Sequence, residues 1–137
     1  MIHAVTPILN VSSIPASLDW FGKVGWETRF VWHGADDREG DPGFGCVGSG
    51  LAEIFLARDG QGSRDARPST HPFDTSTGGA WMSWFLGSAA EVDDLHARAV
   101  ELGLDVSMPP TDEPWGMREF HLRHPDGHTF RVSAPVT

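Results

Sequence analysis

Two runs of alternating apolar and polar residues near the end of the chain predict a β-hairpin. The runs are Met117–Leu122 and His128–Ser133, and His124-Pro125-Asp126-Gly127 lies between them. Proline presets the backbone at the first central position of a turn, and glycine accepts the positive φ of a type I turn that ends in a bulge. We therefore expect an antiparallel pair of strands here.

Apolar residues at intervals of three or four predict two helices. The first begins after Ser13, a suitable N-cap, and ends at Gly25. The second spans Ala89–Gly103, with glycine as the stop signal. Shorter apolar stretches predict the remaining strands, which are Ile2–Leu9, Trp26–His33, Phe44–Val47, Leu51–Ala57, Ala80–Leu86 and Leu104–Ser107.

The order of these elements occurs twice along the chain. Each half reads strand, helix, strand and a pair of strands, and Glu53 and Arg131 lie on the two last strands at equivalent places. We therefore expect an α+β fold in a single domain over residues 1–137. It would contain two βαβββ modules, residues 1–58 and 80–137, joined by a long loop over residues 59–79. The modules would form a cupped, partly open mixed sheet with the helices outside.

Composition and charge narrow the class of partner. A formal net charge of −9 disfavours duplex nucleic acid and anionic membranes, and it is compatible with a cationic small molecule. Cys46 is the single cysteine, which excludes an internal disulfide and a thiolate metal cluster. With no apolar run long enough for a membrane span and no signal sequence, a cytoplasmic location is expected. The excess of arginine over lysine suggests a bacterial source.

The repeated modules and the run Glu113-Pro114-Trp115-Gly116-Met117-Arg118-Glu119-Phe120 resemble the vicinal oxygen chelate superfamily. This superfamily comprises glyoxalases, bleomycin resistance proteins and dioxygenases, and the resemblance covers nearly the whole chain. The run is most similar to that of the bleomycin resistance proteins, from which it differs by one inserted residue, Met117.

The resemblance implies four metal-ligand positions, and these fall on Thr6, Glu53, Trp81 and Arg131. Only Glu53 offers a carboxylate, whereas Arg131 is a permanent cation without a lone pair. We therefore expect no metal and no cofactor at the inherited positions. Arg131 would instead pair with Glu53 across the cup.

A displaced metal site is the alternative. Strand alternation leaves Glu119 and His121 facing the cup, and with Glu53 they could bind a divalent metal. The opposing interpretation, which we favour, is that Glu119 and His121 pair with nearby arginines or water. The remaining histidines of loops, helix and turn are expected at the surface; they are His33, His71, His96, His124 and His128.

The same alternation predicts aromatic walls for the cup. Phe55 shares a face with Glu53, and Phe85 shares a face with Trp81. An apolar, aromatic lining with a few polar groups is typical of a small-molecule pocket, although a filled core would give the same pattern.

Three further aromatic residues, Phe30, Trp32 and Trp115, lie at the margins of predicted strands and loops. Bleomycin resistance proteins are symmetric dimers whose ligand grooves are lined by aromatic and acidic residues, and the resemblance assigns Phe30 and Trp115 to such positions. The acidic loop over residues 36–41 would then suit a cationic, aromatic ligand.

The resulting hypothesis is a homodimeric binding protein that sequesters a small, partly aromatic antibiotic or natural product without metal or catalysis. The alternatives are a metal-dependent enzyme of the glyoxalase or dioxygenase type, with lyase or dioxygenase activity, and a metabolite-binding module of the same fold. The predicted ligand-binding residues are Phe30, Trp32, Glu53, Phe55, Trp81, Phe85, Trp115, Glu119, His121 and Arg131.

Overall fold

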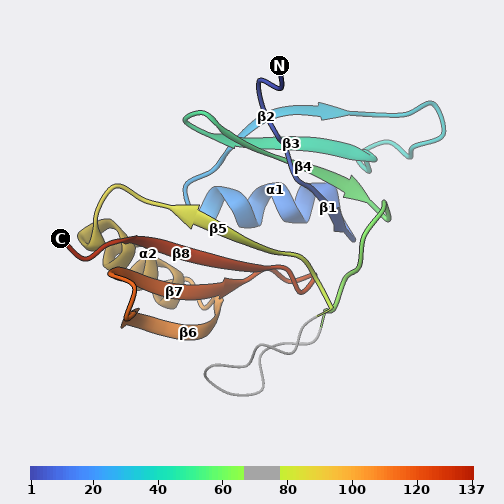
Figure 1. Cartoon of the computed structure of the whole chain (residues 1–137). Coiled ribbons are helices and arrows are strands. Elements are labelled where there is room, and N and C mark those ends of the chain that lie inside the picture. Colours follow the sequence, from blue (N-terminus) through green and yellow to red (C-terminus); the bar gives the residue numbers. More distant parts are fainter. Residues whose placement is uncertain (67–77) are drawn as a thin grey trace. The chain divides into compact units, whose positions relative to one another are not determined.

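The computed structural model describes residues 1–66 and 78–137 (Figure 1). The chain divides into two compact units, Met1–Ser63 (unit 1) and Arg64–Thr137 (unit 2). Each unit contains one helix and an open, four-stranded mixed sheet. The prediction of a surface histidine at position 71 lies outside the described residues, as does much of the predicted loop over residues 59–79.

The strands of unit 1 are arranged in the order β1-β4-β3-β2. Its elements are β1 (Ile8–Val11), α1 (Ile14–Lys23), β2 (Glu27–Trp32), β3 (Phe44–Ser49) and β4 (Ala52–Arg58). Strand β1 pairs in parallel with β4, and the other neighbours are antiparallel. The hydroxyl of Ser13 caps α1 by accepting a hydrogen bond from the Ala16 N–H at 3.2 Å, as the sequence predicts.

Unit 2 repeats this arrangement in the order β5-β8-β7-β6. Its elements are β5 (Trp81–Phe85), α2 (Ala89–Glu101), β6 (Asp105–Asp112), β7 (Met117–Arg123) and β8 (Thr129–Pro135). Gly25 and Gly103 follow the two helices with φ of 96° and 69°, in the left-handed region that favours glycine. The βαβββ repeat and the α+β fold are therefore confirmed.

One face of each sheet is buried under the helix of its own unit. In unit 1, a Cβ on Gly45 would touch Ile14 and Leu18 of α1, so this face of β3 is turned toward the helix. In unit 2, the ring of His96 on α2 meets Phe120 of β7 with centroids 5.3 Å apart. Among the residues that alternate with the cup-facing positions, Ile54, Leu56, Trp84, Phe130 and Val132 are buried. Met82 and Leu86 are only partly buried.

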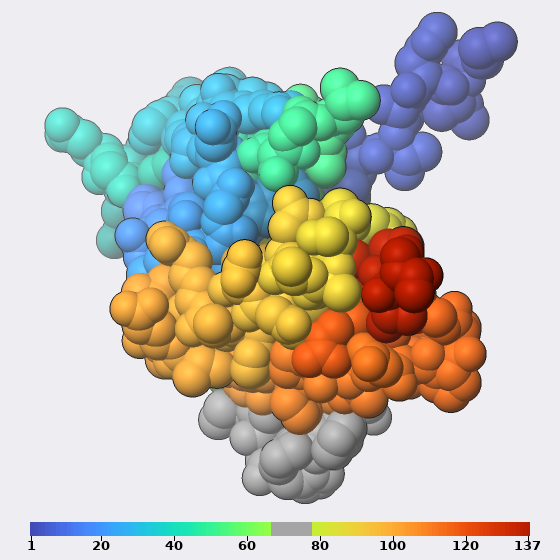
Figure 2. All heavy atoms as spheres, turned by 90° about the vertical axis from the view of Figure 1, so that its left-hand side faces the viewer, coloured from blue at the N-terminus to red at the C-terminus, as the bar shows by residue number. Residues whose placement is uncertain are grey.

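Strand β1 begins at Ile8 and not at Ile2. Pro7 still accepts a hydrogen bond from the Phe55 N–H at 2.9 Å, but it has no N–H with which to continue the ladder. Met1, Ile2 and Val5 are exposed, and this first segment projects from the rest of unit 1 (Figure 2).

Strand β6 is longer than the predicted strand Leu104–Ser107, because it continues through Pro109 and Pro110. It lies at the edge of its sheet, and its register with β7 shifts between Met108 and Thr111. An edge position and an irregular register are the conditions under which a strand tolerates proline. Helix α2 ends at Glu101, before the predicted end at Gly103, and Leu102 is exposed.

The prediction that His124 and His128 lie at the surface is wrong, since both are buried beside the β7–β8 turn. The Nδ1 atom of His124 accepts a hydrogen bond from the Asp126 N–H, and that of His128 accepts one from the Ala80 N–H, both at 3.0 Å. Burial, together with the neighbouring His128, lowers the pKa of His124 to about 3. Both rings therefore act as neutral acceptors inside unit 2.

In the described part of the chain, no helix is long and apolar enough to cross a membrane.

Candidate functional site

The face of the second sheet opposite α2 carries the polar part of the candidate site. Strand register sets its side chains in rows across β5, β8 and β7, because residues directly opposite each other point to the same side of a sheet. One row consists of Ser83, Arg131 and His121, and the next consists of Phe85, Ser133 and Glu119.

Glu119 is at the centre of a charged group on this face. Its Oε1 lies 3.0 Å from Nη2 of Arg131, and its Oε2 lies 3.0 Å from Nε of Arg131 and 2.8 Å from Nε2 of His121. Burial alone would raise the pKa of Glu119, but the hydrogen bonds from Arg131 and His121 outweigh burial and the pKa is lowered. The hydrogen bond to Glu119 also raises the pKa of Arg131. Both groups are therefore ionised, and both carboxylate oxygens are engaged.

The ionised Glu119 determines the hydrogen-bonding role of His121. A carboxylate only accepts, so the Nε2 atom of His121 must carry the hydrogen, and Nδ1 of a neutral ring keeps its lone pair. The edge of the Trp81 ring meets the His121 ring with centroids 5.6 Å apart and an interplanar angle of 89°. His121 is thus held between a carboxylate and an indole. The expected pairing of Glu119 with a nearby arginine is confirmed, whereas His121 pairs with Glu119 and not with an arginine.

Aromatic side chains form the exposed part of the same face. Trp81 is 38% exposed and Phe85 is 74% exposed on β5, and Ser83 lies between them along the strand. The Arg131 side chain is 39% exposed, whereas that of Glu119 is 5% exposed. The aromatic rings and the guanidinium of Arg131 are therefore exposed to solvent, whereas the carboxylate of Glu119 is buried beneath them.

In unit 1, the face of the sheet opposite α1 carries a cluster of three phenylalanines. The ring centroids are 6.2 Å apart for Phe30 and Phe44, 6.1 Å for Phe30 and Phe55, and 5.3 Å for Phe44 and Phe55. Phe30 and its strand neighbour Trp32 remain exposed. The sequence predicts Phe30, Trp32 and Phe55 as site residues but not Phe44, because finding Phe44 requires the register of β3 against β4.

Glu53 pairs with Arg29, on the same face of unit 1. The Nη1 atom of Arg29 lies 2.9 Å from Oε1 of Glu53. The strand register shifts between Thr28 and Phe30, so Arg29 is the extra residue of a bulge and lies across Gly48, where a Cβ would come within 1.9 Å of its Nε. Arg29 and Arg131 thus each have a carboxylate partner within their own unit. This removes the basis for the hypothesis that Arg131 pairs with Glu53.

The donor set does not fit a divalent metal. Of the four positions that the resemblance implies, only Glu53 is a carboxylate, and it accepts from Arg29. Glu119 would have to release Arg131 and His121 to bind a cation, and the fixed guanidinium would repel that cation. Within residues 1–66 and 78–137, no group of three or more His, Cys, Asp and Glu side chains is placed to hold a metal ion.

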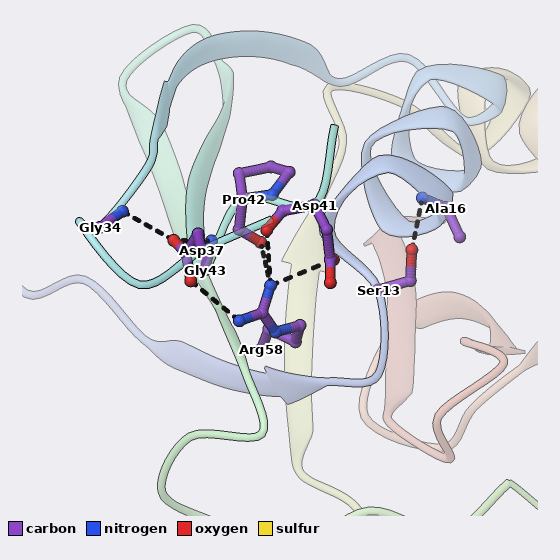
Figure 3. A network of polar contacts seen from close by, with 8 residues as sticks. All are labelled: Ser13, Ala16, Gly34, Asp37, Asp41, Pro42, Gly43 and Arg58. Carbon is purple, nitrogen blue, oxygen red and sulfur yellow. Dashed lines mark hydrogen bonds and ion pairs between the residues drawn. The ribbon is translucent and has the colours of Figure 1, made fainter. Parts of the chain in front are cut away.

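The acidic loop between β2 and β3 uses two of its carboxylates internally (Figure 3). Asp37 accepts from the N–H groups of Gly34 and Gly43 at 2.7 and 2.9 Å and pairs with Nη2 of Arg58 at 2.9 Å. The hydrogen bond from Gly34, supported by Arg58, lowers the pKa of Asp37 against the effect of burial. Asp41 lies 3.1 Å from Nη1 of Arg58. The attraction of this loop for a cationic ligand therefore depends on the exposed Asp36 and Glu39.

Within each unit, the structure brings some of the predicted residues together. Glu119, His121, Arg131 and Trp81 form one group in unit 2. Phe30 and Phe55 form another in unit 1, with Arg29 and Glu53 on the same face. Trp115 is exposed in the β6–β7 turn. Arg29 was missed by sequence reasoning, because nothing in the alternation of β2 marks a bulge.

Comparison with known proteins identifies the fold. A family model described as the Glyoxalase/Bleomycin resistance protein/Dioxygenase superfamily matches residues 1–132. TioX from Micromonospora sp. ML1 is similar with a TM-score of 0.69 and 19% identity, over 98% of this chain and 100% of that chain. Lactoylglutathione lyase from Agrobacterium tumefaciens has a TM-score of 0.66 and 18% identity, over 96% of this chain and 92% of that chain.

A glyoxalase-related enzyme from Clostridium phytofermentans has a TM-score of 0.68 and 19% identity, over 99% of this chain and 97% of that chain. At such low identity these similarities show the fold alone. No curated protein sequence matches the chain.

Proposed function

Because the chain belongs to the glyoxalase/bleomycin resistance protein/dioxygenase superfamily, we propose that it binds a small, partly aromatic natural product or antibiotic without a metal ion. The superfamily contains both enzymes and binding proteins, so the site must decide between them. The similarity of the run Glu113–Phe120 to bleomycin resistance proteins belongs to this proposal. Its biological role would then be capture of a toxic compound in the cytoplasm.

The observation that carries the proposal is the exposure of aromatic side chains on the helix-free sheet faces. Phe30 and Trp32 in unit 1, and Trp81 and Phe85 in unit 2, are all more than a third exposed. Large aromatic rings that are exposed beside fixed polar groups are typical of a surface that binds a ligand or a protein partner. Stacking on such rings would give affinity for a planar compound.

The polar groups on these faces favour binding over metal-assisted catalysis. Each carboxylate at the candidate site is already paired with an arginine, at 2.9 Å for Glu53 and 3.0 Å for Glu119. These pairs neutralise the charge that a metal would otherwise compensate. We therefore propose no cofactor for this site.

A titration of metal-stripped protein with a panel of aromatic antibiotics, including bleomycin-type drugs, tests the function. Tryptophan fluorescence and thermal shift report binding, and Trp81→Ala should weaken it by about tenfold, equivalent to about 1.4 kcal/mol. Leu51→Ala is a matched control, since Leu51 is an exposed apolar residue at the β3–β4 turn. Turnover that requires an added divalent metal would contradict the proposal and support the enzyme alternative. Binding of a metabolite alone would support a metabolite-binding module.

We also propose that the protein is a homodimer. Strand β2 is an edge strand of the sheet of unit 1, and all six of its residues are exposed, among them Phe30, Val31 and Trp32. An exposed apolar edge strand is a place where a second chain can pair or pack. Light scattering should give twice the mass of one chain, and Trp32→Asp should reduce this mass toward that of a monomer. A monomer at all concentrations would contradict this part of the proposal.

A further inference from the structure

Building on the proposed function, we infer that the ligand carries a carboxylate and that Arg131 is the residue that binds it. Arg131 lies on the helix-free face of unit 2, with exposed aromatic rings on the neighbouring strand β5. The occupant would be an aromatic acid whose ring rests on Trp81 or Phe85.

Arg131 has donor capacity left after its ion pair. A guanidinium has five N–H bonds in a fixed plane. Glu119 accepts from Nε and Nη2 of Arg131 at 3.0 Å each, which uses two of these bonds. Among the described residues of unit 2, the two N–H bonds of Nη1 and the second of Nη2 have no acceptor, and the side chain is 39% exposed. A second carboxylate can therefore approach the outer edge of the same guanidinium.

The ion pair also holds the guanidinium in place before any ligand arrives. Glu119 is buried and is itself oriented by His121 at 2.8 Å, so the pair is fixed from below. A side chain that is already ordered loses little conformational entropy when it binds, and the planar fork of arginine matches a carboxylate with two parallel hydrogen bonds. Lysine at this position could not provide both features.

The charge that this face presents to solvent is positive. In the two rows across β5, β8 and β7, Glu119 is the single acidic residue, and it lies beneath the guanidinium that it pairs with. Glu113, in the β6–β7 turn, is the other carboxylate that acts electrostatically on Arg131. Because the whole chain has a formal net charge of −9, attraction of an anion must come from this local arrangement.

Strand geometry places an aromatic contact at a suitable distance from the guanidinium. Ser83 is directly opposite Arg131, and Trp81 and Phe85 lie two residues to either side of Ser83 on the same face. Two residues along a strand span about 7 Å and neighbouring strands lie about 4.8 Å apart, so the Cα atoms of both aromatic residues lie roughly 8 Å from that of Arg131. The exposed hydroxyl of Ser83 would provide a further donor.

A set of three probes with one ring system and different charge tests this inference. They are 2-naphthoate, the neutral 2-naphthamide and the cationic 2-naphthylmethylammonium, each titrated into the metal-stripped protein by calorimetry. We expect naphthoate to bind at least tenfold more tightly than the other two, and we expect this preference to shrink as salt is added. A preference for the cation would overturn the inference. It would favour a cationic ligand, as the acidic loop over residues 36–41 leads us to expect.

Variants separate the role of Arg131 in ligand binding from its role in folding. The double substitution Arg131→Gln with Glu119→Gln removes both charges without leaving one buried alone, and it should abolish the preference for naphthoate while naphthamide binds as before. Arg118→Gln is the matched control, because Arg118 lies on the same strand pair but bonds Asp93 and Asp112. If the double variant retains the preference, Arg131 is not the anchor. Equal binding of all three probes would leave the proposed function standing and overturn this inference, whereas no binding of any probe would overturn both.

Discussion

Glu119 and Arg131 form a two-bond ion pair in which the carboxylate is 5% exposed and the guanidinium side chain is 39% exposed. The pair combines a buried acid with a cation that still reaches solvent. The burial of Glu119 makes the pair important for stability, and the exposure of Arg131 makes the guanidinium available to a ligand. These two roles lead to different experimental consequences.

Arg131→Ala should destabilise unit 2, because it leaves the buried charge of Glu119 without its main partner. We expect a loss of about 2 kcal/mol, below the value for a fully buried pair because Arg131 is partly exposed. Urea unfolding measures this loss. The double variant of Arg131→Gln with Glu119→Gln should lose less than Arg131→Ala, and an equal or greater loss would show that the pair is not the cause.

Glu119 should contribute an acid-dependent part of the stability. Its pKa in the folded protein is lowered, so it binds a proton less readily there than in the unfolded chain. The stabilising contribution is therefore complete above the ordinary pKa of 4.5 and is lost as the pH falls through the folded value. Thermal unfolding of the protein and of Glu119→Gln from pH 7 to pH 3 should show curves that converge at low pH. Parallel curves would contradict the assignment.

His124 should cause a loss of stability that begins at higher pH. Its pKa falls from 6.5 to about 3 on folding. Between these pH values the ring is protonated in the unfolded chain and neutral in the folded protein. As the pH drops below 6.5, this single group should cost up to about 1.4 kcal/mol per pH unit.

His124→Asn keeps an acceptor for the Asp126 N–H and should flatten this slope between pH 6.5 and pH 4. The slope would persist in the variant if another group, such as His128, were its main source.

Gly127 and Gly116 offer a matched pair of substitutions in unit 2. Both have positive φ, 90° and 85°, so alanine is strained at each. A Cβ at Gly127 would lie 2.0 Å from the carbonyl oxygen of Asp65, whereas a Cβ at Gly116 has nothing within 4 Å. We expect Gly116→Ala to cost about 1 kcal/mol and Gly127→Ala at least twice as much. Equal midpoints of denaturant unfolding would show that Asp65 does not press on this turn.

Local patterns were sufficient to predict the repeat and most of its elements. The caps at Ser13, the stops at Gly25 and Gly103, and the turn before His128 are short-range signals, and each lies where its residue type predicts. Strand alternation also predicts the helix-free face that carries Glu119 and His121, because side-chain direction follows from residue parity.

The specific partner of each charge could not be predicted in the same way, because it depends on register between strands. Arg29 reaches Glu53 only because a bulge turns it onto that face, and Arg131 reaches Glu119 through the register of β7 with β8. Burial of His124 likewise depends on residues that flank positions 67–77, since Asp65 donates its N–H to the Asp126 carbonyl at 2.7 Å. Such contacts between distant parts of the chain leave no local signal.

Binding of the ligand without a metal ion separates the proposed function from the metal-dependent enzyme. The most direct measurement is the affinity for 2-naphthoate of protein that has been stripped with a strong chelator, compared with the same protein after addition of Mn²⁺, Fe²⁺, Ni²⁺ or Zn²⁺. We expect the same dissociation constant for the stripped and the metal-supplemented protein. Loss of binding on chelation, with recovery when one of these ions is restored at one equivalent per chain, would contradict it.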